Sequence, residues 1–121
     1  MSKKKTVVIG ASPEPQRYSH RAVLSLLKAG HEVVPVGLQS GRIDDLEIHT
    51  DFVAVEDVHT ATLYVHPKHQ EYWKDYIVSL SPKRVVFNPG AENDDLKDYL
   101  LDKGISCQES CTLVMLAVGT Y

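Results

Sequence analysis

A glycine, two serines and an arginine lie close together near the start of the chain, and these residue types are suited to holding a phosphate group. Gly10 permits close backbone approach, Ser12 and Ser19 supply hydroxyls, and Arg17 supplies forked guanidinium donors. An amphipathic segment follows, and the first N–H groups of a helix have no partner within it. The pattern predicts an anion site in residues 10–19. The alternative is that Gly10 only makes the turn and Arg17 faces water.

The glycine pattern of this loop separates it from two common nucleotide sites. A dinucleotide fingerprint needs G-x-G-x-x-G and an acidic residue near the end of the second strand. The loop has only Gly10, and residues 36–39, which follow the second predicted strand, carry no carboxylate. A P-loop needs G-x-x-x-x-G-K-[ST], which the chain lacks. NAD and ATP are therefore disfavoured as ligands of this loop.

Other reactive side chains have plainer explanations. His66 and His69 are spaced for a shared metal ion, but no clear third ligand accompanies them. Cys107 and Cys111 lie beside an apolar segment and are expected to be buried thiols. The carboxylates at 92, 94 and 95 suit the positive end of a helix. No catalytic residue and no metal ligand is predicted. The aromatic residues at 72, 73 and 76 are expected to pack in the core and along a helix.

Short apolar runs alternate with amphipathic segments along the chain. Ser19 is expected to cap the first helix and Asn93 the third. Residues 52–55 are read as a small strand or a buried connection, and residues 112–118 as a strand or a helix, because a continuous apolar run has no period. Strands are predicted at residues 7–9, 31–36, 62–65, 84–87 and 105–107, and helices at residues 19–29, 68–80 and 94–103.

Parallel strands need crossover connections, so this alternation predicts an α/β fold with a mostly parallel central sheet and helices on both faces. In such sheets ligands bind outside the carboxyl ends of the strands, near the switch in strand order. The loops expected at that edge are residues 10–19, 36–42, 66–67 and 88–90.

Composition restricts the class of protein. A chain of 121 residues fits one domain, predicted to span residues 1–121, and its 43% hydrophobic and 24% charged content is that of a globular protein. No apolar run approaches the roughly 20 residues that span a bilayer, and no signal-like segment precedes the first strand, so no membrane association and a cytoplasmic location are expected. A net charge of −3 argues against general nucleic-acid binding. The apolar residues 117–121 leave a homodimer open.

Several short motifs together resemble a known family. They are Gly10-Ala11-Ser12-Pro13 with Ser19 opening the helix, Val34-Pro35-Val36, Tyr64-Val65-His66-Pro67, Asn88-Pro89-Gly90-Ala91-Glu92-Asn93, and Cys111 near the end. Their order and spacing over about residues 5–115 resemble the CoA-binding domain family. That family comprises small stand-alone bacterial proteins and the N-terminal domain of the succinyl-CoA synthetase alpha subunit.

The resemblance implies a Rossmann-like three-layer fold that binds coenzyme A, or an acyl-CoA, at the carboxyl ends of its strands. With coenzyme A as the ligand, the alternative to buried thiols at Cys107 and Cys111 is a thiol near the CoA sulfur, able to form a mixed disulfide with it. The resemblance also implies Gly10, Ala11, Ser12, Arg17 and Ser19 on the phosphates, Val36 and Gly37 on the adenosine side, His66 and Pro67 along the middle of the ligand, and Asn88, Pro89 and Gly90 at the pantetheine end.

The chain also departs from the family pattern. Many members follow the second strand with Asn-Pro-Lys, whereas this chain has Val36-Gly37-Leu38, so a lysine for the 3′-phosphate is missing. Two alternatives follow: Arg17, Arg42 or Lys68 substitutes for it, or the affinity for CoA is low. The synthetase carries its phosphorylated histidine on a further domain, so ligase activity is not implied. The prediction is a non-catalytic CoA-binding carrier or sensor. The alternatives are a small nucleotide-dependent enzyme, either an NAD-linked oxidoreductase or a transferase, and a scaffold that has lost its ligand.

Overall fold

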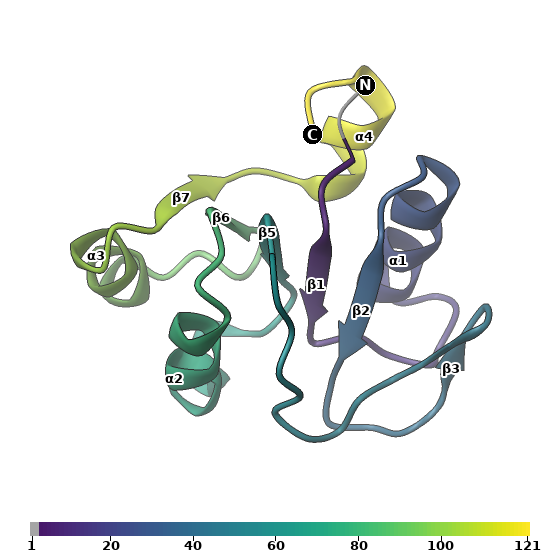
Figure 1. The fold of residues 1–121 in the computed structure, drawn as a ribbon, viewed down its shortest axis with the longest axis horizontal. Helices are drawn as coiled ribbons and strands as arrows, with labels where there is room; N and C mark the ends of the chain where they lie inside the picture. Colours follow the sequence, from purple (N-terminus) through teal and green to yellow (C-terminus); the bar gives the residue numbers. More distant parts are fainter. Residues whose placement is uncertain (1–2) are drawn as a thin grey trace.

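The computed structural model describes residues 3–121, and a five-stranded sheet forms its centre (Figure 1). All four neighbouring pairs are parallel, and the first strand of the chain places Thr6 opposite Val33 on one side and Thr60 on the other. The strands, in their order across the sheet, are β2 (Val33–Val36), β1 (Thr6–Ile9), β5 (Thr60–Leu63), β6 (Arg84–Phe87) and β7 (Ser106–Glu109).

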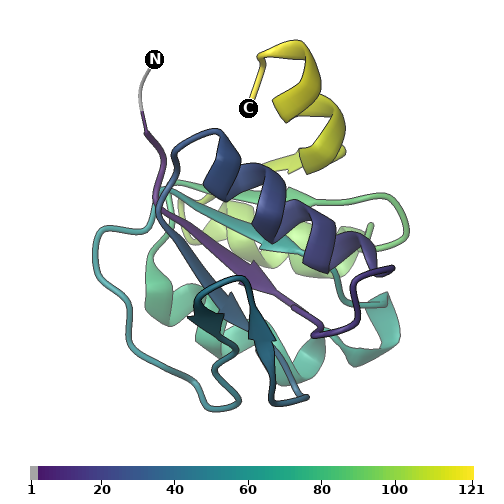
Figure 2. The ribbon, with the colours of Figure 1, turned by 90° about the vertical axis from the view of Figure 1, so that its right-hand side faces the viewer.

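Helices cover both faces of this sheet, as Figures 1 and 2 show. Helices α1 (Tyr18–Lys28) and α4 (Thr112–Val118) lie on one face, and α2 (Glu71–Leu80) and α3 (Asp94–Asp102) lie on the other. The predicted Rossmann-like three-layer α/β fold is confirmed. A short hairpin of β3 (Arg42–Ile43) and β4 (Leu46–Glu47), which was not predicted, follows β2. No helix within residues 3–121 is long and apolar enough to cross a membrane.

The alternation of side chains along β1 divides the core into two clusters. Val7 and Ile9 belong to a cluster that includes Ile77 of α2 and Leu100 of α3. Val8, on the opposite face of the strand, packs in the cluster that holds Val23 and Leu26 of α1. Because both faces of the strand are buried, its sequence is a continuous apolar run rather than an alternating one.

Several predicted boundaries need correction. Helix α1 begins at Tyr18 with Arg17 as its N-cap residue, so the prediction that Ser19 caps it was wrong. Strand β5 lies two residues earlier than predicted, and β7 one residue later. The helix predicted from residue 68 splits into the 3-10 turn η1 (Pro67–His69) and α2, because Pro67 opens a separate tight turn. The cap by Asn93 is confirmed, since its Oδ1 accepts a hydrogen bond from Leu96 N at 3.2 Å.

The two segments left open by the sequence resolve as a connection and a helix. Residues 52–55 form no strand; the carbonyl of Val53 instead accepts a hydrogen bond from the Tyr76 hydroxyl at 2.8 Å. Residues 112–118 form α4. The Thr112 hydroxyl pairs with the Thr62 hydroxyl of β5 at 2.7 Å, which fixes the start of α4 against the sheet.

Candidate functional site

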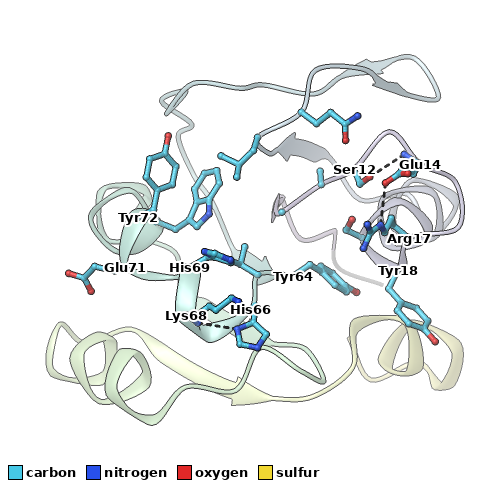
Figure 3. A pocket seen from close by; sticks show the side chains of 17 residues that line it. Ser12, Glu14, Arg17, Tyr18, Tyr64, His66, Lys68, His69, Glu71 and Tyr72 are labelled. Carbon is cyan, nitrogen blue, oxygen red and sulfur yellow. Dashed lines mark hydrogen bonds and ion pairs between the residues drawn. The ribbon is translucent and has the colours of Figure 1, made fainter.

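A cavity of about 880 Å³ opens at the carboxyl ends of β1 and β5 (Figure 3). Its lining comes from the loop after β1, from residues 38–39 after β2, from residues 64–66 after β5, and from η1 and the start of α2. The chain passes from β1 to β2 on one side and returns to β5 on the other side of β1. The cavity therefore lies at the point where strand order reverses, the usual ligand position in open α/β sheets.

The cavity brings together half of the residues that the sequence assigned to a ligand. Gly10, Ala11, Ser12, Arg17, Ser19 and His66 line it. Val36, Gly37, Pro67, Asn88, Pro89 and Gly90 lie outside its lining.

Two glycines shape the loop after β1 by permitting close backbone contact. Gly10 has a φ of 91°, and a Cβ atom there would lie 2.5 Å from the Tyr64 carbonyl oxygen. A Cβ atom at Gly37 would collide with the carbonyl oxygen of Ala11. The N–H groups of Gly10 and Ala11 both donate to the Val36 carbonyl, at 2.9 and 3.0 Å. Val36 and Gly37 therefore contact the backbone of the loop at Gly10 and Ala11 and fix its position.

The loop then leads into the N-terminus of α1, where polar groups gather. Ser19 is buried in the first turn, and the N-cap residue Arg17 makes no side-chain hydrogen bond to the helix. The guanidinium of Arg17 is 65% exposed and pairs with Glu14 across 3.3 Å. His20 Nδ1 hydrogen-bonds the Ser12 carbonyl at 2.9 Å, which ties the loop to the helix. The positive end of the helix and Arg17 together favour an anion at this end of the cavity.

Basic and imidazole side chains line the middle of the cavity, as Figure 3 shows for His66, Lys68 and His69. His66 Nδ1 accepts a hydrogen bond from Lys68 N at 3.2 Å, which fixes the start of η1. Arg42 lies elsewhere, in the β3–β4 hairpin, where it donates to the Asp45 carbonyl at 2.8 Å. Among the described residues, no group of three His, Cys, Asp or Glu side chains is placed to hold a metal ion.

The opposite end of the cavity is lined mostly by aromatic and aliphatic side chains, with Gln39 and Glu71 beside them. Leu38, 74% exposed, and Tyr72, 57% exposed, line this part together with Trp73. The Phe52 ring packs 5.1 Å from the Tyr72 ring and 5.2 Å from the Tyr76 ring, measured between centroids. Trp73 and Tyr76 are buried, as core packing requires, whereas Tyr72 faces the cavity. The cavity therefore joins an anion-binding end to an apolar end.

The Asn88 side chain serves the fold. It is 1% exposed, and its Nδ2 donates to the Thr62 hydroxyl at 2.7 Å and to the Leu63 carbonyl at 3.0 Å. Its Oδ1 accepts from Thr112 N at 2.9 Å. The amide connects β5, the end of β6 and the start of α4, so its hydrogen-bonding groups are already occupied.

Gln70 is a positioning residue that the sequence did not reveal. Its buried Nε2 donates to the carbonyls of Val65 and Ala91, at 2.8 and 2.7 Å, and its Oε1 accepts from Asn93 Nδ2 at 3.0 Å. It thereby joins the loop after β5 to the loop after β6. No local pattern distinguishes such a glutamine from one on the surface.

Tyr64 is a second lining residue that the sequence analysis did not assign to the site. Burial raises the pKa of its phenol well above the usual value, and the nearby Cys111 raises that pKa further. The phenol therefore keeps its proton at neutral pH. Cys107 and Cys111 are half-buried free thiols outside the cavity lining, and burial raises the pKa of Cys107.

Comparisons with known proteins agree with this geometry. A family model described as a CoA binding domain matches residues 4–117. The crystal structure of an uncharacterized protein is similar, with a TM-score of 0.98, 44% identity and 100% of both chains covered. No curated protein matches the chain.

Two archaeal structures share the fold. A hypothetical protein from Pyrococcus horikoshii OT3 gives a TM-score of 0.82 at 21% identity, covering 91% of this chain and 79% of its own. A conserved hypothetical protein from Pyrococcus furiosus gives a TM-score of 0.76 at 26% identity, covering 87% of this chain and 91% of its own.

Proposed function

The chain belongs to the CoA-binding domain family, and from that premise we propose that it binds coenzyme A or an acyl-CoA in the cavity at the carboxyl ends of β1 and β5. The observation that carries the proposal is the two-ended lining of this cavity. One end is suited to phosphates, and the other to an apolar group. Coenzyme A and its thioesters combine both kinds of chemistry in one molecule.

The phosphates are assigned to the loop after β1 and the N-terminus of α1. Support comes from Ser12 and Arg17, which line the cavity, and from the unpaired first N–H groups expected of any helix. Gly10 and Ala11 bring the backbone close, and Ser19 completes the first turn. A bound phosphate would accept hydrogen bonds from these donors, so its negative charge would be paired when it enters the cavity.

Lys68 is our candidate for the basic residue that replaces the missing lysine after β2. It lines the cavity, whereas Arg42 is held in the hairpin by its contact with Asp45. Loss of Lys68 would therefore be expected to reduce the preference for a ligand that carries the 3′-phosphate.

A binding role without catalysis, as a carrier or sensor, fits the lining side chains. His66 Nδ1 is engaged in holding the start of η1, and no group of three metal-binding side chains is found among residues 3–121. Contact of Val36 and Gly37 with adenosine, of Pro67 with the middle of the ligand, and of residues 88–90 with pantetheine stays a prediction. The same holds for a single domain over residues 1–121, a cytoplasmic location and a homodimer.

Isothermal titration at one fixed salt concentration tests the proposal, with coenzyme A, dephospho-CoA, acetyl-CoA and NAD as ligands. We expect coenzyme A and acetyl-CoA to bind, dephospho-CoA to bind more weakly, and NAD not to bind. Binding of NAD without coenzyme A would favour a nucleotide-dependent enzyme. No binding of any of the four ligands would favour a scaffold that has kept the fold and lost the ligand.

A further inference from the structure

The loop after β1, to which the phosphates are assigned, contains a carboxylate, Glu14. Neither the family resemblance nor the predicted anion site gives this residue a role. Glu14 lines the same cavity end as Ser12 and Arg17, and Figure 3 shows the three side by side. A negative charge at this place is unexpected in a site for phosphates. Its contacts explain what it does there.

Glu14 contacts both side chains that are proposed to hold the phosphate. Its Oε2 lies 3.3 Å from Arg17 Nε, and its backbone N–H donates to the Ser12 hydroxyl oxygen at 3.1 Å. The second contact leaves the Ser12 hydroxyl proton available for a ligand. The first engages Arg17 with an internal anion.

We propose that Glu14 is an internal competitor of the ligand, a carboxylate that occupies Arg17 in the free protein and that the ligand phosphate must displace. This inference rests on the proposed function of the site. The Arg17 side chain is 65% exposed and that of Glu14 is partly exposed, at 45%, so water weakens the ion pair enough for it to exchange.

The exchange sets the same cost for every anion that binds Arg17. A phosphate group offers more charge and more acceptor oxygens than a carboxylate, and a guanidinium binds it through two parallel hydrogen bonds. A ligand carboxylate only replaces Glu14 with the same kind of contact. Glu14 therefore lowers the affinity for every anion by a similar factor, and a phosphate, which interacts most strongly with Arg17, keeps the highest remaining affinity.

The variant Glu14→Gln removes the charge and keeps the local backbone. The N–H of residue 14 still reaches Ser12, and the hydrogen bond from Arg17 N to the carbonyl of residue 14, 3.1 Å long, is unaffected. Glu71→Gln is a matched control, because Glu71 also lines the cavity but pairs with Lys74 at 3.6 Å, away from Arg17. Thermal unfolding of each variant confirms that it is folded.

Titrations with coenzyme A and with inorganic pyrophosphate, at about 0.1 M salt so that distant charges are screened, test the inference. We expect Glu14→Gln to tighten binding of both by about two- to fivefold, the range of an exposed ion pair. Glu71→Gln should change binding by less than about twofold, since a distant exposed charge is screened. In an Arg17→Ala background the gain from Glu14→Gln should disappear.

Each other outcome decides the matter. Unchanged or weaker binding by Glu14→Gln, in a protein whose parent binds, overturns the inference and leaves the proposed function standing. A gain in affinity from Glu14→Gln that persists in the Arg17→Ala background also overturns the inference, because repulsion between Glu14 and the ligand anion would then explain it. A gain for pyrophosphate with no binding of coenzyme A supports the inference and contradicts the proposed function. No binding of either probe by any form contradicts both.

Discussion

The two edges of the sheet differ in how their polar groups are used. At the carboxyl edge, the loop after β1 and the segment after β5 border an open cavity, with exposed side chains such as Arg17 and Tyr72. At the amino edge, where the strands begin, Tyr121 covers the ends of two strands, and we call this the closed edge. Its hydroxyl forms a hydrogen bond with the Thr6 hydroxyl at 2.8 Å, and the Arg84 guanidinium lies 4.5 Å from its ring centre. The difference separates a face that serves binding from one that serves stability.

His31 belongs to the closed edge. Its ring centre lies 5.2 Å from that of Tyr121 in an edge-on arrangement, and its Nδ1 accepts a hydrogen bond from Lys4 N at 2.9 Å. An Nδ1 atom that accepts carries no proton. Burial lowers the pKa of His31, and nearby Lys3, Lys4 and Arg84 lower that pKa further.

The largest effect expected at either edge comes from the buried amide behind the cavity. Asn88→Ala removes the partner of Thr112 N and one of the two partners of the Thr62 hydroxyl. We expect the free energy of unfolding to fall by about 3 kcal/mol. Urea unfolding measures this. Asn93→Ala is the comparison: it removes a helix cap and the hydrogen bond to Gln70 Oε1, with an expected loss of about 2 kcal/mol. Equal losses would show that the Asn88 network contributes no more than this cap and its one further hydrogen bond.

The next effect separates binding from stability at the open edge. Arg17→Ala should weaken coenzyme A binding by about 1.5–3 kcal/mol, the range for a hydrogen bond to a charged group. The free energy of unfolding should change by less than about 0.5 kcal/mol, because the Glu14 pair is exposed. Titration calorimetry and urea unfolding give the two numbers. An unchanged dissociation constant would remove Arg17 from the site.

The smallest effect expected is the pH dependence of the closed edge. His31 and His59 both have a lowered pKa in the folded protein, so the unfolded chain binds more protons below its own value of about 6.5. Stability should be fully present above that pH and should decline as the pH falls through the folded values. Unfolding curves between pH 7 and pH 5 measure the decline.

A variant assigns this decline to the closed edge. His31→Gln should reduce the slope of the pH profile, and His59 should supply the slope that remains. A profile unaffected by His31→Gln would exclude His31 as its source.

The sequence predicted the fold well because the fold depends on local patterns. Continuous apolar runs at β1 and β6 indicated buried strands, and the 3.6-residue spacing of Trp73, Ile77 and Leu80 indicated α2. Boundaries failed where a tertiary contact outweighed a local preference. Ser19, a good capping residue, instead became a buried residue of the first turn of α1.

Apart from His66, the predicted residues that line the cavity all come from one loop. Residues 10–19 are contiguous, so residue type and spacing were informative there. Leu38, Tyr64 and Tyr72 come from three different segments, and they meet only because parallel strands end at one edge. Gln70 likewise acts through contacts that are distant in sequence, with Ala91 and Asn93.

The central claim is that the carboxyl edge of the sheet binds coenzyme A and that the amino edge only stabilises the fold. A map of amide chemical shifts during titration with coenzyme A tests this claim most directly. The account predicts that the largest changes fall in residues 10–19 and 64–69, and that Thr6, His31 and Tyr121 remain unshifted. Changes concentrated around Tyr121, or no changes at saturating coenzyme A, would contradict it.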